Sequence, residues 1–139
     1  MSSRREPKWL SRTQVEAIHA MQLEQYGGLH GVRDAAALES ALGRPQNRWH
    51  YGAAEDVAAC AAAYGFALAK NHAFSDGNKR TAFVAMATFA EHNGYVVTAN
   101  EPDAVTTMLA VADGSLTEDG LAKWIRVNSK RRRPGRRLP

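Results

Sequence analysis

A short polar segment near the middle of the chain gathers side chains suited to acid–base and phosphate chemistry. It contains one histidine, one carboxylate, one amide and two cations, namely His72, Asp76, Asn78, Lys79 and Arg80. Histidine is the side chain that most readily exchanges a proton near neutral pH, so His72 is a candidate general base. A carboxylate close to phosphates is favourable when a divalent cation such as Mg²⁺ lies between them, so Asp76 is a candidate metal ligand.

Gly77 and the residues that follow it predict a tight turn and then the start of a helix. Glycine permits such a turn or a close approach of a ligand. The unpaired N–H groups and the dipole at a helix N-terminus favour an anion. Lys79 and Arg80 oppose this dipole in the first turn, at a cost of about 0.3–1 kcal/mol each. A phosphate chain would convert that repulsion into charge-assisted hydrogen bonds, so the residues indicate phosphate binding.

Each of these side chains also has a purely structural explanation. A histidine in a loop is more often structural than catalytic, and Asp76 or Asn78 could cap the following helix. Lys79 and Arg80 could belong to a solvated helix face. This explanation leaves the paired cations at the helix start unexplained, and on residue chemistry alone the two interpretations are evenly matched.

The rest of the chain predicts an all-α bundle of about six helices that would position this segment. Alanine is abundant and β-branched residues are sparse, which favours helix over strand. Ser11 with Gln14, or Thr13 with Glu16, fits a capping box at the start of the first helix, and Asp34 can cap the second. Capping signals and glycines place the helices at 11–26, 35–42, 55–70, 78–93, 101–112 and 115–128. The alanine-rich helix over 55–70 is expected at the centre, because small side chains let neighbouring helices approach closely.

The connections between these helices are expected to be short. Gly43 and Pro45 are expected to end the second helix, which leaves 44–54 as a loop or a short hairpin. Residues 95–98 are expected to form a short extended segment.

Length and composition fit one domain. The chain has 139 residues, of which 45% are hydrophobic, and a single cysteine, Cys60. A lone cysteine favours a reducing compartment, and we find neither a membrane span nor a signal peptide, so a cytoplasmic protein is expected. Cys60 itself is expected to be a small buried hydrophobe.

The basic character is concentrated at the C-terminus. Residues 130–137 contain six of the 18 basic residues, and the remaining chain carries a net charge of −2. We expect three parts: an N-terminal extension over 1–10, a folded domain over 11–129 and a basic disordered tail over 130–139. Such a tail could bind nucleic acid weakly and in a salt-dependent way.

The string His72-Ala-Phe-Ser-Asp-Gly-Asn-Lys-Arg-Thr-Ala82 resembles the signature of the Fic/Doc family, and its end resembles the Doc branch most. The stretches 26–34, 38–45 and 93–95 also look like that branch, and the resemblance covers roughly 10–128. It implies an all-α Fic/Doc-like bundle with a flap over 48–54 that aligns a target peptide.

The resemblance also implies roles for the site residues. His72 would deprotonate a target hydroxyl, Asp76 would bind Mg²⁺, and Arg80 would act in catalysis and on phosphate. Phosphate oxygens would be held by Gly77, Asn78, Lys79 and Arg80.

Two positions depart from the AMP-transferring Fic pattern. Lys79 stands where those proteins have glycine, and Phe83 stands where they have a second arginine. In the Doc branch the nucleotide binds in a reversed orientation that presents its γ-phosphate. The resemblance therefore implies transfer of the γ-phosphate of ATP rather than of AMP.

The leading hypothesis is a Doc-like toxin that phosphorylates a translation factor, with elongation factor Tu as the expected target. A cognate antitoxin would restrain it by folding a disordered segment into its groove. One alternative is AMP transfer of the Fic type. Another, of a different class, is a non-catalytic nucleic-acid-binding or scaffold protein that uses the basic tail.

Overall fold

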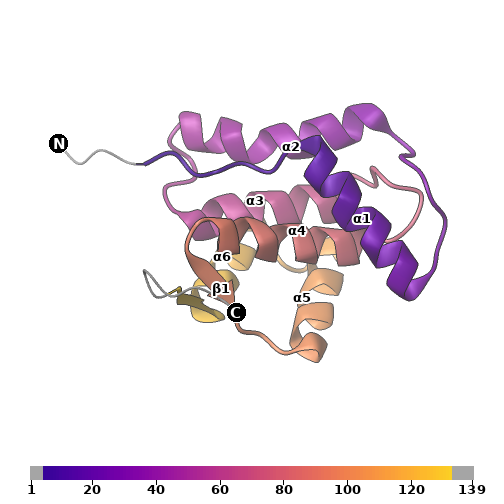
Figure 1. The fold of residues 1–139 in the computed structure, drawn as a ribbon. Coiled ribbons are helices and arrows are strands. Elements are labelled where there is room, and N and C mark those ends of the chain that lie inside the picture. Colours follow the sequence, from indigo (N-terminus) through magenta and orange to yellow (C-terminus); the bar gives the residue numbers. More distant parts are fainter. Residues whose placement is uncertain (1–4, 133–139) are drawn as a thin grey trace.

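The computed structural model describes residues 5–132. Over this range the chain forms six helices and one small two-stranded sheet, which confirms the expected all-α bundle (Figure 1). The helices are α1 (Arg12–Tyr26), α2 (Ala35–His50), α3 (Val57–Lys70), α4 (Asn78–His92), α5 (Glu101–Asp113) and α6 (Glu118–Val127). None of the helices in this range is long and apolar enough to cross a membrane.

The helix α3 forms the centre of the bundle. It contacts α2, α4, α5 and α6, and most of its length is buried. In Figure 1, α2 lies on one side of α3, and α5 and α6 lie on the other. Its alanines remove side-chain bulk and so allow these close contacts, as the sequence predicted, and Cys60 is buried among them.

The helix starts follow from capping side chains that the sequence reveals. Ser11 and Gln14 form the predicted capping box at the start of α1, in which each side chain accepts a hydrogen bond from the other residue's N–H. The carboxylate of Asp34 accepts from the N–H of Ala37 at the start of α2. The predicted caps at these two helices are confirmed.

The predicted end of the second helix is wrong. The helix α2 continues through Gly43 and Pro45 to His50. Proline inside a helix removes one backbone hydrogen bond and costs about 3 kcal/mol, but Pro45 is buried here. It extends the apolar face that Leu38, Ala41 and Leu42 begin, and these residues recur at helical spacing.

Polar contacts also hold the second half of α2. Arg44 and Arg48 pair with Glu118 at the start of α6. The loop or short hairpin expected over 44–54 is therefore shorter than predicted. Residues 44–50 belong to α2, and the connection to α3 is a turn over 51–56 without a strand.

The two strands, β1 (Tyr95–Val97) and β2 (Ser129–Arg131), pair in antiparallel register, with Val96 opposite Lys130. The extended segment predicted over 95–98 is confirmed. The tail predicted from Lys130 onward instead begins in this strand, because β1 offers Lys130 and Arg131 backbone hydrogen-bonding partners. Residues 133–139 of that predicted tail, like residues 1–4 at the other end, lie outside the described range.

The N-terminal segment packs on the bundle just before α1. The N–H of Leu10 donates to the hydroxyl of Tyr64 (2.9 Å), and the Trp9 ring stacks on Phe89 with centroids 5.7 Å apart. Burial raises the pKa of the Tyr64 hydroxyl to about 12. Pro7 and Leu10 are buried, so the part of the predicted extension closest to α1 belongs to the folded body.

Candidate functional site

The predicted polar segment forms the connection between α3 and α4. A second loop, over 27–34, runs alongside it, and Val32 pairs with Phe74 in an isolated antiparallel bridge. The N–H of Ser75 donates to the carbonyl of Gly31 (3.1 Å). Ala73 and Phe74 are buried beneath this contact. The loop after α1 therefore fixes the backbone of the site segment.

His72 begins this segment with an unusual backbone conformation. Its φ is 51°, which makes it the one described residue other than glycine with a positive φ. Its carbonyl accepts a hydrogen bond from Nε of Arg33 (3.0 Å). The side chain is exposed and can meet a substrate from solvent. Left-handed backbone at a non-glycine residue is uncommon and concentrates at functional sites.

Asn78 uses its side chain to close the loop. Its Oδ1 accepts from the N–H of Phe74 (3.0 Å), and its Nδ2 donates to the carbonyl of Phe74 (3.0 Å). The side-chain amide of Asn78 is thus engaged with the main chain, and its backbone N–H is one of the first-turn groups of α4 that have no intrahelical partner.

The start of α4 differs from every other helix start in residues 5–132. The other five helices each have a capping side chain that accepts from a first-turn N–H, provided by Ser11, Asp34, Asp56, Asn100 and Thr117. Gly77 precedes α4 with φ 75° and ψ 19°, and no described side chain caps this helix. The predicted turn at Gly77 is confirmed. Intrahelical bonding begins with the N–H of Thr81, which donates to the carbonyl of Gly77 (3.0 Å).

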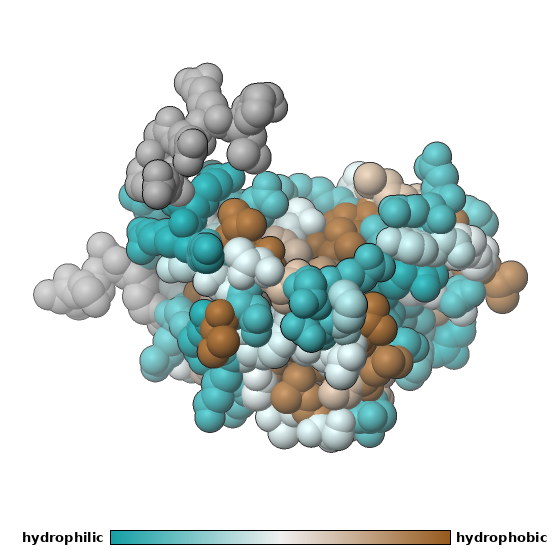
Figure 2. Space-filling model, turned by 90° about the horizontal axis from the view of Figure 1, so that it is seen from below, coloured by the Kyte–Doolittle hydropathy of each residue, from teal (hydrophilic) through white to brown (hydrophobic). Residues whose placement is uncertain are grey.

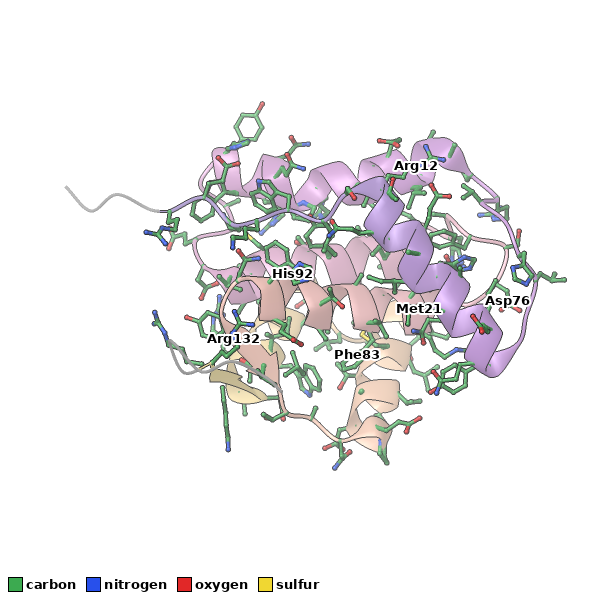
Figure 3. All side chains as sticks on the ribbon, viewed as in Figure 1. Arg12, Met21, Asp76, Phe83, His92 and Arg132 are labelled. Carbon is green, nitrogen blue, oxygen red and sulfur yellow. The ribbon has the colours of Figure 1, made fainter. Side chains whose placement is uncertain are left out.

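Asp76 lies immediately before this uncapped end, next to the end of α1 (Figure 3). Its Oδ1 accepts from the N–H of Gly77 (2.8 Å), and its Oδ2 accepts from the N–H of Leu29 (3.3 Å). These two hydrogen bonds lower the pKa of the Asp76 carboxyl, and the positive charges of Arg80 and Lys79 lower it further. Asp76 is therefore a carboxylate at neutral pH.

The two predicted cations are exposed in the first turn of α4. The Arg80 guanidinium lies over the ring of Tyr26, with its carbon 4.8 Å from the ring centroid. This contact holds the Arg80 side chain, which extends from the first turn of α4, against the end of α1. Thr81 and Ala82 are fully buried, as expected for residues that pack the helix.

An open groove of about 550 Å³ runs from this end of α4 along the face of α5. In Figure 3, Phe83 lies between α4 and α5, away from Asp76. The groove joins a charged end to an apolar wall, and it is lined by Asp76, Gly77, Asn78, Lys79, Arg80, Tyr26, Gln22, Phe83, Val84, Ala99, Glu101, Ala104, Val105, Met108 and Leu109. Five of the six predicted site residues line it, and His72 stands in the connecting segment outside that lining.

The donor set suits a cation that is shared with a bound phosphate. No three histidine, cysteine or carboxylate side chains gather into a metal site within residues 5–132. Mg²⁺ in phosphate-transfer sites uses one or two carboxylates, phosphate oxygens and water. Asp76 provides one ionised carboxylate beside two cations, and this set fits Mg²⁺ that arrives with a nucleotide.

Several residues of the site were not predicted from the sequence. His19 of α1 contacts the carbonyl of Asp76, and Gly28 and Leu29 approach its carboxylate. Tyr26 contacts Arg80. The sequence signal for Tyr26, Gly28 and Leu29 is the run 26–34, which resembles the Doc branch but carries no role of its own, and His19 lies outside that run.

Comparison with known proteins shows the family to which this chain belongs. A sequence profile of the Fic/DOC family matches residues 9–90, which is more than half of the chain. Protein kinase doc of Escherichia phage P1 is 32% identical over 117 residues, covering 84% of this chain and 92% of that protein. Toxin Doc of Mycolicibacterium smegmatis is 42% identical over 76 residues, covering 54% of this chain and 58% of that protein. The chain therefore belongs to the Fic/DOC family.

Proposed function

We propose that this protein is a Doc-type toxin that transfers the γ-phosphate of ATP to a serine or threonine hydroxyl of a translation factor. The observation that carries the proposal is the uncapped start of α4 with Lys79 and Arg80 in its first turn. Backbone N–H groups and cations converge there on an open groove, which is the arrangement that binds phosphate. The names of the two relatives, a protein kinase and a toxin, support the same activity.

The site residues act as follows in this proposal. His72 accepts the proton of the target hydroxyl. The hydroxyl oxygen forms a bond to the γ-phosphorus while the bond from that phosphorus to the bridging oxygen breaks, and ADP leaves. Arg80 and Lys79 stabilise the negative charge on the transferring group and on ADP. The backbone N–H groups after Gly77 hold phosphate oxygens, and the Asn78 side chain keeps their loop in shape.

Asp76 would hold Mg²⁺ in this proposal. When bound, Mg²⁺ neutralises charge on the phosphate oxygens and makes ADP a better leaving group. The hydrogen bonds from Gly77 and Leu29 keep Asp76 ionised for this purpose.

Transfer of AMP is less well supported than transfer of phosphate. Phe83 occupies the position of the second Fic arginine, and its ring packs edge-on against Trp124 with centroids 6.5 Å apart. An aromatic side chain held in this way cannot pair with phosphate.

Elongation factor Tu is the target we propose, in the cytoplasm, because the Doc branch is expected to act on it. In this proposal the expected target-aligning flap over 48–54 is reduced to the turn over 51–56, in which Tyr51 is strongly exposed.

The apolar part of the groove is the proposed site for an antitoxin segment. Val105 and Leu109 of α5 are about half exposed, as is Tyr26 of α1. On the side of the molecule where α5 lies, separate apolar patches interrupt the hydrophilic surface (Figure 2). A disordered segment that folds into an amphipathic helix covers such a face with its apolar side. Because Asp76 and Arg80 line the same groove, a bound segment would restrain the enzyme in trans.

The test is transfer from ATP labelled on either the α- or the γ-phosphate, with Mg²⁺ and elongation factor Tu. The proposal expects the γ label, and a mass increase of one phosphate, on the target. Transfer of the α label alone would establish AMP transfer instead. If neither label reaches elongation factor Tu or any lysate protein and expression leaves growth unaffected, the chain is not this enzyme.

The alternative, in which the basic C-terminus has a non-enzymatic function, predicts a different effect of removing that segment. Lys130 and Arg131 lie in β2, and further cations follow in the sequence. A chain truncated after Arg132 should keep full γ-phosphate transfer in the enzyme proposal. If truncation alone abolishes toxicity while transfer persists, the C-terminus carries the function.

A further inference from the structure

Three hydrogen bonds from different parts of the chain hold Asp76. Its carbonyl oxygen lies 2.8 Å from Nε2 of His19, and its Oδ2 accepts from the N–H of Leu29. The third bond, from Gly77 to Oδ1, is local. The first two come from α1 and the loop after it, 57 and 47 residues earlier in the chain. The orientation of Asp76 therefore depends on a remote segment.

His19 contacts the site segment at two points. A carbonyl oxygen only accepts hydrogen bonds, so Nε2 of His19 is protonated and its N–H donates to the carbonyl of Asp76. The His19 ring also stacks on Phe74, with centroids 3.8 Å apart and planes 12° apart. Both side chains are buried. A rigid buried ring that contacts residues 74 and 76 fixes the peptide between them, and with it the direction of the Asp76 side chain.

Gly28 completes this arrangement because it has no side chain. A Cβ at this position would lie 2.7 Å from Oδ2 of Asp76, which is closer than real Cβ contacts allow. Its φ of 124° is also favourable only for glycine. The main chain can thus pass close to the carboxylate and present the N–H of Leu29 to it.

We propose that His19 is a positioning residue for Asp76, and that the main chain at Gly28 and Leu29 orients the carboxylate together with it. Each carboxylate oxygen accepts one N–H, so lone pairs remain on both for a cation. The inference rests on the proposed function in that Asp76 is there the Mg²⁺ ligand. Groups that orient a metal ligand typically change metal affinity about 10–100-fold when they are removed.

Two substitutions separate the two contacts of His19. His19→Phe keeps an aromatic ring against Phe74 and removes the donor to Asp76. His19→Gln keeps an N–H donor and removes the ring. We expect the Mg²⁺ concentration for half-maximal transfer to rise about tenfold or more in His19→Phe, with the KM for the target protein unchanged. His19→Gln should recover part of this loss.

A glycine pair provides the matched control. Gly27 and Gly28 are adjacent and both have positive φ, but a Cβ on Gly27 meets nothing within 4 Å. Both alanine substitutions strain a backbone with positive φ, but only Gly28→Ala brings a Cβ against Asp76, and against a methyl group of Leu23 at 3.0 Å. We expect Gly28→Ala to raise the Mg²⁺ requirement and Gly27→Ala to leave it near wild type. If His19→Phe fails to fold, this glycine pair still tests whether the contacts around Asp76 set the Mg²⁺ requirement.

The backbone amide signals of Leu29 and Gly77 in NMR spectra give a readout without any nucleotide. Both amides donate to the Asp76 carboxylate, and Asp76→Ala provides their reference positions. The proposal expects His19→Phe and Gly28→Ala to move the Leu29 signal toward this reference, and Gly27→Ala to leave it in place. A Leu29 signal that stays at its wild-type position in His19→Phe and Gly28→Ala would overturn the positioning role. If the signal moves as expected but the wild-type protein transfers no phosphate, the positioning role stands and the proposed function fails.

Discussion

The starts of α3 and α4 lie on two adjacent central helices and are built in opposite ways. Asp56 caps α3, with its Oδ1 accepting from the N–H of Ala59 (2.8 Å), and both its oxygens pair with Arg126. Gly77 leaves α4 uncapped and two cations follow it. At the α3 start the carboxylate both caps the helix and pairs with a cation, whereas at the α4 start the Asp76 carboxylate bonds to Gly77 and Leu29 and no described side chain caps the first-turn N–H groups. This difference supports the proposal that the α4 start receives a ligand and the α3 start has a structural role.

The conformation of Gly77 explains why α4 has no cap. The five capping residues have extended backbones, from φ −74° at Asn100 to −143° at Asp34. That conformation directs a side chain toward the first-turn N–H groups. Gly77 has a left-handed backbone and no side chain that could accept from these groups, so the first-turn N–H groups of α4 have no cap and could bind an outside anion.

The largest expected effect is the loss of His72, the proposed general base. His72→Asn removes the proton acceptor and keeps a residue that tolerates the left-handed backbone. We expect the rate of γ-phosphate transfer to fall about 10²–10⁴-fold, as for the loss of a general base. ATP binding, measured by calorimetry, should change little. Wild-type turnover in this variant would exclude His72 as the base.

Two arginines test whether the two helix starts have different purposes. Arg80→Ala removes a cation from the uncapped end, and we expect transfer to fall about 10²–10³-fold. Its unfolding midpoint in urea should stay near wild type because the side chain is exposed. Arg126→Ala at the capped end should instead lower stability and leave transfer intact. Equal effects of the two variants on activity would remove the distinction between the helix starts.

The cap of α3 should contribute measurably to stability. Asp56→Ala removes both the hydrogen bond to Ala59 and the pair with Arg126. We expect a loss of about 1–2 kcal/mol in the free energy of unfolding, from the cap and an exposed ion pair together. Asp56→Asn, which retains a capping oxygen, should lose less. Urea denaturation of the three proteins measures this order, and no loss in Asp56→Ala would contradict it.

The smallest expected effect is a pH dependence of the same cap. The Arg126 guanidinium and the N–H of Ala59 lower the pKa of the Asp56 carboxyl below its usual value of 3.8. The unfolded chain therefore binds this proton at higher pH than the folded chain does. The contribution is present above pH 3.8 and is lost as pH falls through the folded pKa. Urea midpoints between pH 5 and 3 should fall less in Asp56→Asn than in wild type, and parallel falls would contradict the assignment.

Local signals predicted most of the fold, and packing decided the rest. The capping box at Ser11 and the cap at Asp34 depend on residues within one turn, and both predictions are confirmed. Pro45 is a local signal for a helix end, but burial of α2 against α3 overrides it. The strand at Lys130 depends on pairing with Val96, which no local pattern reveals.

The site likewise has features that local sequence predicts and contacts that depend on packing. Its uncapped helix start and the two cations are contiguous in sequence, and their clustering was predictable. The contact of His19 with Asp76 spans 57 residues, and the close approach of Gly28 depends on how α1 docks. Neither could be predicted from spacing, since a histidine within a helix and a glycine in the loop after it have many structural explanations.

The central claim is that the start of α4 binds the phosphates of a nucleotide. The most direct measurement is a titration of the ¹⁵N-labelled protein with Mg²⁺ and ATP, followed through its backbone amide signals. We expect the amide signals of Asn78, Lys79 and Arg80 to shift together until the shift saturates with ATP. The signal of the Ala59 amide, at the capped start of α3, should not shift. Saturating ATP that leaves the three α4 amides unmoved would contradict it.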